Sequence, residues 1–389
     1  MNMSYNNPSW PYRLIALFSV LALSLLFLIV IIQSGAPIMP AMIVSGPPAA
    51  SSSAPAIAEL KKNKSLPPAF TRGIYLTAYS AARDEWRGRL IEKMKTGRVN
   101  SVVIDIKDYT GFILYPSALP VVTELKTANS LIKDAKKILD EFHAAGIYVI
   151  ARQTVFQDPA LARARPEYAL KTYAGRVWYD SSGLAWVDPQ NKEVWDYNAA
   201  IAREAATIGF DEINFDYMRF PSDGNLKSIN FHLPENKTKA AVMEEFYAYL
   251  SNELSDTVNI SIDMFGLVLD NAKRDYDLGI GQRLQGALDN FDFICPMAYP
   301  SHYPKSYLNL GNPAAYPAAV INYDIKTSAP YFENKRAGLR LWLQAFDMGA
   351  VYDETKVEAQ ITAVETATST AGWLLWNARN YYPDYIFKK

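Results

Sequence analysis

Four aspartates lie at or near the ends of apolar, strand-like runs. They are Asp105 and Asp108 in SVVIDIKD (101–108), Asp216 in EINFDYMRF (212–220) and Asp263 in NISIDMFG (259–266). Burying a carboxylate costs several kcal/mol unless it is paired, so apolar cores rarely collect carboxylates. Glycosidic bond cleavage needs one protonated acid for the leaving oxygen and one ionised carboxylate as nucleophile or base. These aspartates are therefore candidate catalytic residues of a glycoside hydrolase.

Residue parity predicts where these side chains point. Side chains alternate between the two faces of a strand, and the apolar set of a barrel strand should face the helices outside. This leaves Asp216 and Asp263 inside the barrel, near its top. Asp105 shares its parity with Lys107, and Asp108 follows at the strand end. The alternative role for each aspartate is a strand-end cap or a salt-bridge partner.

Aromatic and polar residues occur at the same strand ends. Four aromatic residues could stack on the apolar faces of sugars: Tyr79, Tyr217, Tyr299 and Trp376. Three polar residues could hydrogen-bond sugar hydroxyls: Arg219, Gln344 and Asn377. For any single aromatic residue, core or rim packing is the alternative. Together they predict a sugar-binding rim.

Eight β-rich apolar runs must position these residues. They are 72–79, 101–108, 147–155, 212–220, 259–266, 291–299, 339–346 and 373–380. Helical patterns separate them at 84–96, 130–145, 192–208, 239–254, 282–290, 313–326 and 354–369. Strands that alternate with helices indicate a parallel sheet, and eight such strands predict an α/β (β/α)₈ TIM barrel.

The main alternative to a barrel is an open doubly wound sheet, but no Gly-rich phosphate turn follows any strand run. Residues 381–389 are too few for an eighth helix after the last strand. A helix that begins near Glu59 could fill this gap. Two long connections, 157–190 and 221–236, follow strands three and four on the face where barrel enzymes build their sites.

The N-terminal region predicts a membrane anchor. Residues 14–32 carry no charge and are long enough to cross a bilayer of about 30 Å as a helix. We expect 1–13 to be cytoplasmic, 33–58 to be a Pro/Ala/Ser-rich linker and 59–389 to be an extracytoplasmic barrel domain, because Arg13 favours an inside N-terminus. A cleaved signal peptide is the alternative.

The composition argues against several classes of function. The net charge is −1, from 39 basic and 40 acidic residues, so capture of nucleic acid by a basic surface is not expected. The single cysteine, Cys295, lies in an apolar run and reads as a buried core thiol. The three histidines are too scattered for a zinc signature. We therefore expect no metal and no organic cofactor.

Several motifs in order carry a family resemblance. They are RGIYLTAYSA, VVIDIKDYTG, GFDEINFDYMRFP, PMAYPSHY, WLQAF and GWLLWNARNYY. Together they resemble a bacterial family described as "putative glycosyl hydrolase domain", over nearly all of residues 70–389. The resemblance implies a barrel and, less directly, glycoside hydrolysis.

The chain is more distantly similar to family-18 chitinases, whose fourth strand reads G-F-D-x-x-D-x-D-x-E. Gly209, Phe210, Asp211 and Asp216 match this motif, Asn214 replaces its middle Asp, and Met218 takes the place of the catalytic Glu. Met297-Ala298-Tyr299 and Trp376 resemble that family's sixth- and eighth-strand motifs. Methionine cannot protonate a leaving group, so a mechanism that depends on that Glu is excluded.

The sequence thus favours an extracytoplasmic glycoside hydrolase that acts on a surface or environmental polysaccharide. Asp216 would be the nucleophile or base and Asp263 the general acid, with exchangeable roles, and Asp105 and Asp108 would support them. A catalytically inactive glycan-binding barrel is the rival, favoured by Met218. A metal hydrolase that uses the aspartates is a third reading, weakened by the lack of nearby histidine.

Overall fold

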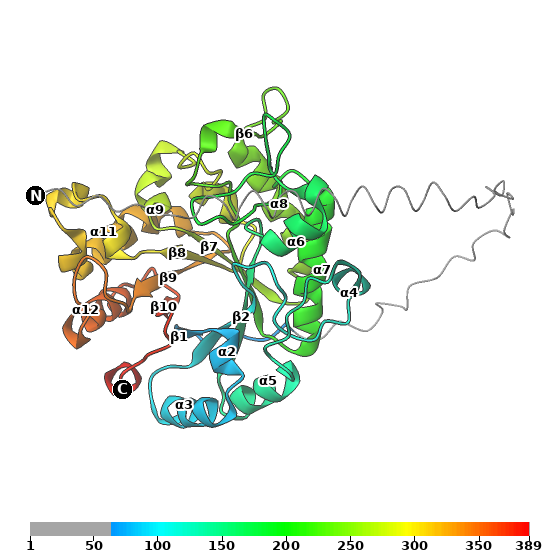
Figure 1. Ribbon diagram of the computed structural model, residues 1–389. Coiled ribbons are helices and arrows are strands. Elements are labelled where there is room, and N and C mark those ends of the chain that lie inside the picture. The colour runs from blue at the N-terminus through cyan, green and yellow to red at the C-terminus, as the bar shows by residue number, and fades with distance from the viewer. Residues whose placement is uncertain (1–63, 389) are drawn as a thin grey trace, which may run out of the picture. The chain divides into compact units, whose positions relative to one another are not determined.

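Eight parallel strands close into a barrel in the computed structural model, which describes residues 64–388 (Figure 1). They are β1 (Thr71–Leu76), β2 (Ser101–Lys107), β3 (Tyr148–Thr154), β5 (Glu212–Asp216), β7 (Asn259–Phe265), β8 (Phe293–Met297), β9 (Gly338–Gln344) and β10 (Gly372–Trp376). Each strand pairs with the next along the chain, and β10 pairs with β1. The predicted barrel and its eight strands are confirmed.

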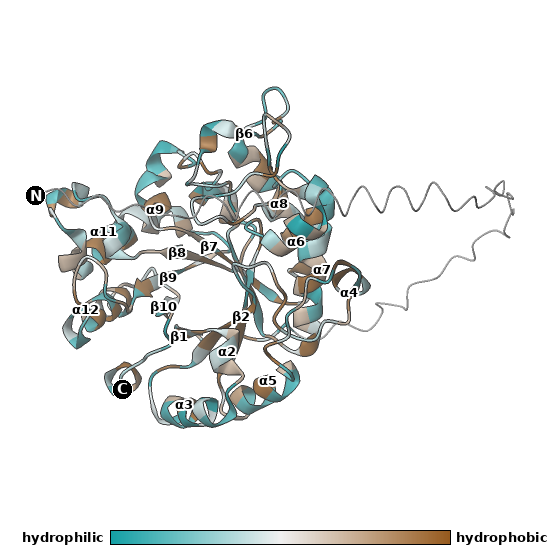
Figure 2. Cartoon of the chain, in the orientation of Figure 1, coloured by the Kyte–Doolittle hydropathy of each residue, from teal (hydrophilic) through white to brown (hydrophobic). Residues whose placement is uncertain are grey.

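Helices surround the strands (Figure 1). The longer ones are α3 (Asp84–Thr96), α5 (Ala135–Ala144), α7 (Lys192–Ile208), α8 (Lys239–Leu254), α11 (Pro317–Phe332) and α12 (Glu354–Glu365). The shorter ones are α2 (Ala78–Ala81), α4 (Pro120–Leu125), α6 (Pro159–Ala164), α9 (Leu267–Asn271) and α10 (Leu284–Ala287). Polar N-caps begin several of them; for example, Asn191 accepts from the backbone N–H groups of Glu193 and Val194 at the start of α7. Figure 2 shows hydrophilic and hydrophobic residues on the same helices, as expected when one face is buried.

One predicted helix is much shorter in the structure, because the helix expected at 282–290 is only the short α10. As predicted, no full helix follows β10 within the described residues. There, the short 3₁₀ helix Asp384–Phe387 packs beside α3, and the Phe387 carbonyl accepts a hydrogen bond of 3.1 Å from Arg98 N–H. The helix expected to begin near Glu59 lies mainly outside the described residues.

The core has two layers. A large hydrophobic layer fills the space between strands and helices, and a smaller cluster fills the barrel interior: Tyr75, Val103, Tyr148, Ile150, Phe293, Cys295, Tyr299, Trp342 and Leu374. Cys295 is fully buried there, and burial raises the pKa of its thiol to about 12. A thiol with that pKa is a core group rather than a nucleophile, as predicted.

The parity prediction is correct for Asp216 and Asp263 but wrong for Lys107 on β2 and for Met218 beyond the end of β5. Ile213, Phe215 and the apolar residues of β7 pack in the outer layer, so Asp216 and Asp263 face inward. The pairing of β2 with β3 shifts register between Asp105 and Lys107, which turns Lys107 outward. There its ammonium forms a fully buried ion pair of 2.7 Å with Asp158.

The two long connections meet each other. β4 (Lys171–Thr172), in the connection after β3, pairs antiparallel with β6 (Ile229–Asn230), in the connection after β5. Trp178 Nε1 in the first connection also donates to the Asn225 carbonyl in the second, at 3.1 Å. The connections after neighbouring strands therefore form one structured unit beside the C-terminal ends of the strands.

No helix within residues 64–388 is long and apolar enough to cross a membrane. The predicted anchor at 14–32, the N-terminal segment 1–13 and the linker 33–58 all lie outside the described residues.

Candidate active site

An arginine that the sequence interpretation did not single out lies at the centre of the predicted carboxylate cluster. Arg152 on β3 donates from Nη1 to Asp105 Oδ1 at 2.7 Å and from Nη2 to Asp216 Oδ2. Its Nε lies 3.8 Å from Asp263 Oδ2. All four side chains are buried. A fixed positive charge therefore lies among three carboxylates that arrive on three different strands.

Asp263 on β7 is held as a neutral acid. Its Oδ1 accepts hydrogen bonds from Trp342 Nε1 at 2.7 Å and Asn214 Nδ2 at 2.9 Å. Burial and the nearby charge of Asp216 raise the pKa of Asp263 to about 8. Since both donors use Oδ1, the proton of the neutral acid belongs on Oδ2.

Asp216 ends β5 and is held as an acceptor. Its Oδ1 accepts from the backbone N–H of Tyr217 at 2.6 Å, and its Oδ2 accepts from Arg152. Tyr217 has a positive φ of 53°, a conformation uncommon for non-glycine residues. The chain therefore turns sharply after Asp216, and the next residue, Met218, packs fully buried in the layer outside the barrel.

Asp105 and Asp108 lie in different environments. Asp105 accepts from the Tyr75 hydroxyl as well as from Arg152, and burial raises its pKa. Asp108 lies beyond β2 and accepts from Thr110 N–H at 2.9 Å. The structure thus brings Asp105 into the cluster and places Asp108 in a local turn.

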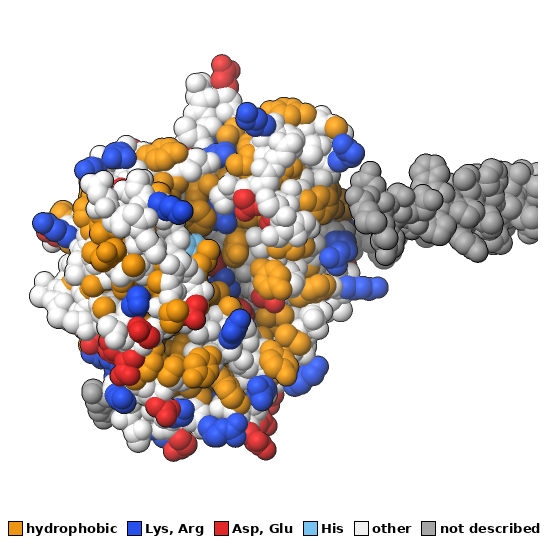
Figure 3. Space-filling view, turned by 60° about the vertical axis from the view of Figure 1, so that its left-hand side comes forward, with side chains coloured by type: hydrophobic (Ala, Val, Ile, Leu, Met, Phe, Trp, Pro, Cys, Tyr) orange, Lys and Arg blue, Asp and Glu red, His pale blue; other side chains and the backbone are white. Residues whose placement is uncertain are grey.

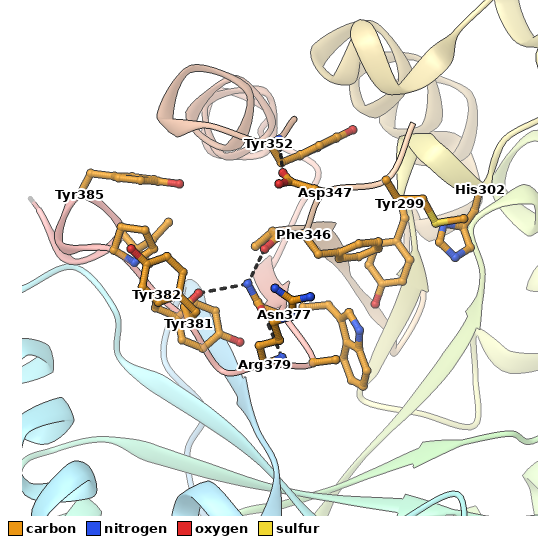
Figure 4. A pocket seen from close by; sticks show the side chains of 16 residues that line it. Tyr299, His302, Phe346, Asp347, Tyr352, Asn377, Arg379, Tyr381, Tyr382 and Tyr385 are labelled. Atoms are coloured by element: carbon orange, nitrogen blue, oxygen red, sulfur yellow. Dashed lines mark hydrogen bonds between the residues drawn. The ribbon is translucent and has the colours of Figure 1, made fainter. Parts of the chain in front are cut away.

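Two adjoining cavities occur beside the cluster. The smaller, of about 350 Å³, is lined by Asp216, Tyr217, Arg219, Phe265, Gly266, Leu267, Met297, Tyr299, His302 and Tyr303. The larger, of about 640 Å³, shares Tyr299 and His302 with it and extends along the ends of β9 and β10. Figure 4 shows the larger cavity and its many aromatic side chains. A sugar chain could thus contact Asp216 in one cavity and aromatic rings in the next.

The rim residues predicted from sequence divide into three groups. Tyr217 and Arg219 line the smaller cavity, Trp376 and Asn377 line the larger one, and Tyr299 lines both. Gln344 is fully buried, where it accepts from Ser301 N–H at 3.1 Å and donates to the Phe346 carbonyl at 2.9 Å. Tyr79 on α2 is 64% exposed and is not among the residues that line these cavities.

Trp376 links the larger cavity to the carboxylate cluster. Its ring stacks on Tyr75 with the centroids 4.0 Å apart, and the Arg152 guanidinium lies 5.1 Å from the centre of the Trp376 ring. Tyr75 in turn donates to Asp105. An aromatic surface therefore continues directly into the charged centre.

Several lining residues were missed by sequence reasoning. His302 lies on the wall common to both cavities and makes an edge contact with the Tyr299 ring. Tyr381, Tyr382 and Tyr385 line the larger cavity from the segment after β10 (Figure 4). The aromatic run NARNYYPDY was the available signal, but only its first residue, Asn377, was predicted to contact the sugar.

The charges elsewhere do not point to another kind of site. Within residues 64–388, no three His, Cys, Asp or Glu side chains are placed to hold a metal ion. On the face shown in Figure 3, Lys and Arg side chains are interspersed with Asp and Glu, and neither sign forms a continuous patch.

Comparison with known proteins gives a family match. The sequence profile of the family described as "Putative glycosyl hydrolase domain" matches residues 73–382. A hypothetical protein from Ruminiclostridium thermocellum is 38% identical over 49% of this chain and 96% of its own, with a TM-score of 0.46. No curated protein matches the sequence.

Two solved structures share the fold at low identity. The PgaB (BpsB) glycoside hydrolase domain from Bordetella bronchiseptica has a TM-score of 0.56 and 15% identity, and the match covers 82% of this chain and 95% of that domain. The α-galactosidase TtGalA from Thermus thermophilus has a TM-score of 0.52 and 11% identity, covering 82% of this chain and 64% of that one.

Proposed function

The chain belongs to the family described as "Putative glycosyl hydrolase domain", and on that premise we propose that it hydrolyses glycosidic bonds of an extracellular or cell-envelope polysaccharide. The observation that carries the proposal is the contrast between two neighbouring carboxyls. Asp216 accepts hydrogen bonds from two donors, one of them a guanidinium, whereas burial raises the pKa of Asp263 to about 8. One site would thus hold both protonation states that the reaction needs.

Asp216 is the proposed nucleophile or base. It lines the smaller cavity, and its Oδ2 forms an ion pair with Arg152. Its hydrogen bond from Tyr217 N–H fixes the carboxylate orientation. In the reaction, Asp216 would attack the anomeric carbon directly or take a proton from the attacking water.

Asp263 is the proposed source of the proton. It is 1% exposed and is not among the cavity-lining residues, so another group must stand between it and the leaving oxygen. Tyr299 lines both cavities, and after burial the charges of Asp263 and Asp216 are the largest causes that raise its pKa. The proton of Asp263 would reach the leaving oxygen along the cavity wall that Tyr299 forms.

Asp105 is a supporting carboxylate in this proposal. It shares Arg152 with Asp216 and is fixed by the Tyr75 hydroxyl. The larger cavity, with Trp376 and Asn377, would bind further sugar units of the chain. The proposed location outside the cytoplasm rests on the apolar run at residues 14–32.

The rival function is an inactive glycan-binding barrel. Met218 was its main argument, but that side chain packs outside the barrel and not in the cavity. The test is a panel of glycans scored in parallel for binding and for new reducing ends. Release from at least one bound glycan is expected; tight binding with no release from any bound glycan would favour the inactive barrel.

A further inference from the structure

Arg219 lines the smaller cavity without a carboxylate partner. Four arginines among residues 64–388 are at least nine-tenths buried: Arg87, Arg152, Arg219 and Arg340. Arg87, Arg152 and Arg340 each have a carboxylate oxygen within 2.8 Å. Arg219, at 7% exposed, has none within 4.0 Å among the described residues. A buried charge normally requires a partner of opposite sign.

The contacts of Arg219 occupy its faces and leave most of its edge free. Its guanidinium carbon lies 4.7 Å from the centre of the Phe265 ring, 4.9 Å from that of Trp186 and 5.3 Å from that of Tyr217. Stacking of this kind offsets part of the cost of burying a cation. The N–H groups lie in the guanidinium plane, however, and only Nη1 donates within the described chain, to the Phe220 carbonyl at 3.1 Å.

The nearby acidic groups are Asp216, Asp223 and Asp180, and none of them forms an ion pair with Arg219 within 4.0 Å. Asp216, which lines the same cavity, already accepts from Arg152 and from Tyr217 N–H. Most other lining residues are apolar or aromatic, such as Phe265, Leu267 and Met297. An anion that entered the cavity would therefore find one unpaired guanidinium edge in a mainly apolar and aromatic wall.

From this we propose that the smaller cavity selects an acidic sugar, whose carboxylate or other oxyanion binds the free edge of Arg219. The proposal rests on the glycoside hydrolase function and narrows its substrate to anionic glycans. A planar guanidinium binds a carboxylate through two parallel N–H···O bonds, whereas a sugar hydroxyl offers neither charge nor that geometry. Sulfate and phosphate esters share the same oxyanion chemistry.

The test compares acidic oligosaccharides with neutral counterparts of the same linkage. Calorimetry on the full-length protein would use uronic acid oligosaccharides and their carboxyl-reduced forms, with sulfated and phosphorylated oligosaccharides as separate arms. We expect binding of one acidic class to be at least about tenfold tighter than that of its neutral counterpart. Added salt should shrink this difference only in part, because the site is buried.

Variants assign the preference to one residue. Arg219→Gln should abolish the preference, and Arg219→Lys should retain only part of it because the two-bond geometry is lost. Arg176→Gln removes the same charge from an exposed position that does not line the cavity, and it should keep the preference. If Arg219→Gln does not fold, Arg219→Lys still tests the assignment to this residue, and the wild-type comparison of acidic and neutral partners still tests the preference itself.

Two results separate this proposal from the proposed function. Cleavage of a neutral glycan with no preference for any acidic partner would overturn the role of Arg219 and leave the hydrolase intact. Binding of acidic glycans without cleavage would support the role of Arg219 and contradict the hydrolase. An acidic preference that survives Arg219→Gln would also overturn the assignment.

Discussion

Trp342 Nε1 donates a hydrogen bond of 2.7 Å to Asp263 Oδ1. This contact connects the carboxyl of Asp263 on β7 to the indole ring of Trp342 on β9. Asn214 donates to the same oxygen from β5. The carboxyl is thus oriented by strands on both sides, and its proton belongs on the oxygen that faces Arg152. The two donors by themselves favour the ionised carboxylate, but burial and the charge of Asp216 outweigh them and raise the pKa of Asp263 to about 8.

The first prediction concerns the pH dependence of stability. Because the folded-state pKa of Asp263 is raised to about 8, the folded protein binds a proton that the unfolded chain releases near its ordinary pKa of about 3.9. The stability that protonated Asp263 contributes is therefore fully present below that ordinary pKa and is lost as the pH rises toward 8. Asp263→Asn mimics the neutral acid and should remove this loss.

The measurement is the free energy of unfolding of the wild type and of Asp263→Asn at pH 5, 7 and 9. We expect the free energy of unfolding of the variant, relative to that of the wild type, to increase by more than about 1.4 kcal/mol between pH 5 and pH 9. This is the equivalent of one pKa unit. Parallel curves for the two proteins would mean that Asp263 is not held neutral in the folded state.

The second prediction concerns Arg152. Arg152→Met leaves Asp105 and Asp216 buried without their common cation, which should destabilise the fold by about 3–5 kcal/mol. Denaturant unfolding measures this loss. Arg152→Lys keeps the charge but cannot donate to Asp105 and Asp216 from two separate nitrogens. Its stability should therefore lie between that of the wild type and that of Arg152→Met. Wild-type stability in Arg152→Met would contradict the central role of this arginine.

Arg152 should also control the pH profile of activity. The charge of Arg152 lowers the pKa of Asp263, so the basic limb of the rate profile of Arg152→Lys, which keeps the cation, should stay close to that of the wild type. In Arg152→Met, any residual activity should have its basic limb at higher pH, because loss of the cation raises the pKa of the proposed acid. A purely structural role would lower the rate without moving this limb.

The third prediction assigns binding to the larger cavity. Trp376→Ala removes a ring that lines this cavity and stacks on Tyr75. Stacking of a sugar on one ring should contribute about 1 kcal/mol, so binding of oligosaccharides should weaken by about fivefold to tenfold. Tyr173→Ala, at a residue that directly follows β4 and is 73% exposed, is the matched control and should bind like the wild type. Unchanged binding by Trp376→Ala would place the sugar elsewhere.

The fourth prediction concerns the N-terminal region. If residues 14–32 anchor the protein, the full-length chain should fractionate with membranes, whereas a chain that begins at Glu59 should remain soluble and folded. Sequencing of the mature N-terminus from native material is the complementary measurement. A mature N-terminus near residue 36 would replace the anchor with a cleaved signal peptide.

The fold and the two central aspartates could be predicted because they depend on local patterns. Strand runs and helical runs are each short-range signals, and strict alternation within a strand decides that Asp216 and Asp263 face inward. The helices at 84–96, 192–208 and 239–254 have the predicted bounds, because the residue patterns around them end abruptly at caps and glycines.

Other features depend on contacts that no local pattern records. Lys107 faces outward because β2 shifts its register against β3, and this shift is visible only in the pairing of the two strands. Arg152 lies in an apolar strand run, and no residue next to it in the sequence marks it as important. Its role comes from carboxylates on three other strands. Met218 left the barrel interior because Tyr217 adopts a positive φ, which its residue type does not predict.

Asp216→Asn is the substitution that tests the central claim most directly. Asparagine has nearly the same shape, so the fold and the binding of oligosaccharides should be largely retained, while hydrolysis should fall by at least about 10²–10⁴-fold. The measurement is reducing-end release from a glycan that the wild type cleaves, with affinity for the same glycan determined in parallel. The account predicts retained affinity with lost release. Hydrolysis by Asp216→Asn within about tenfold of the wild-type rate would contradict it.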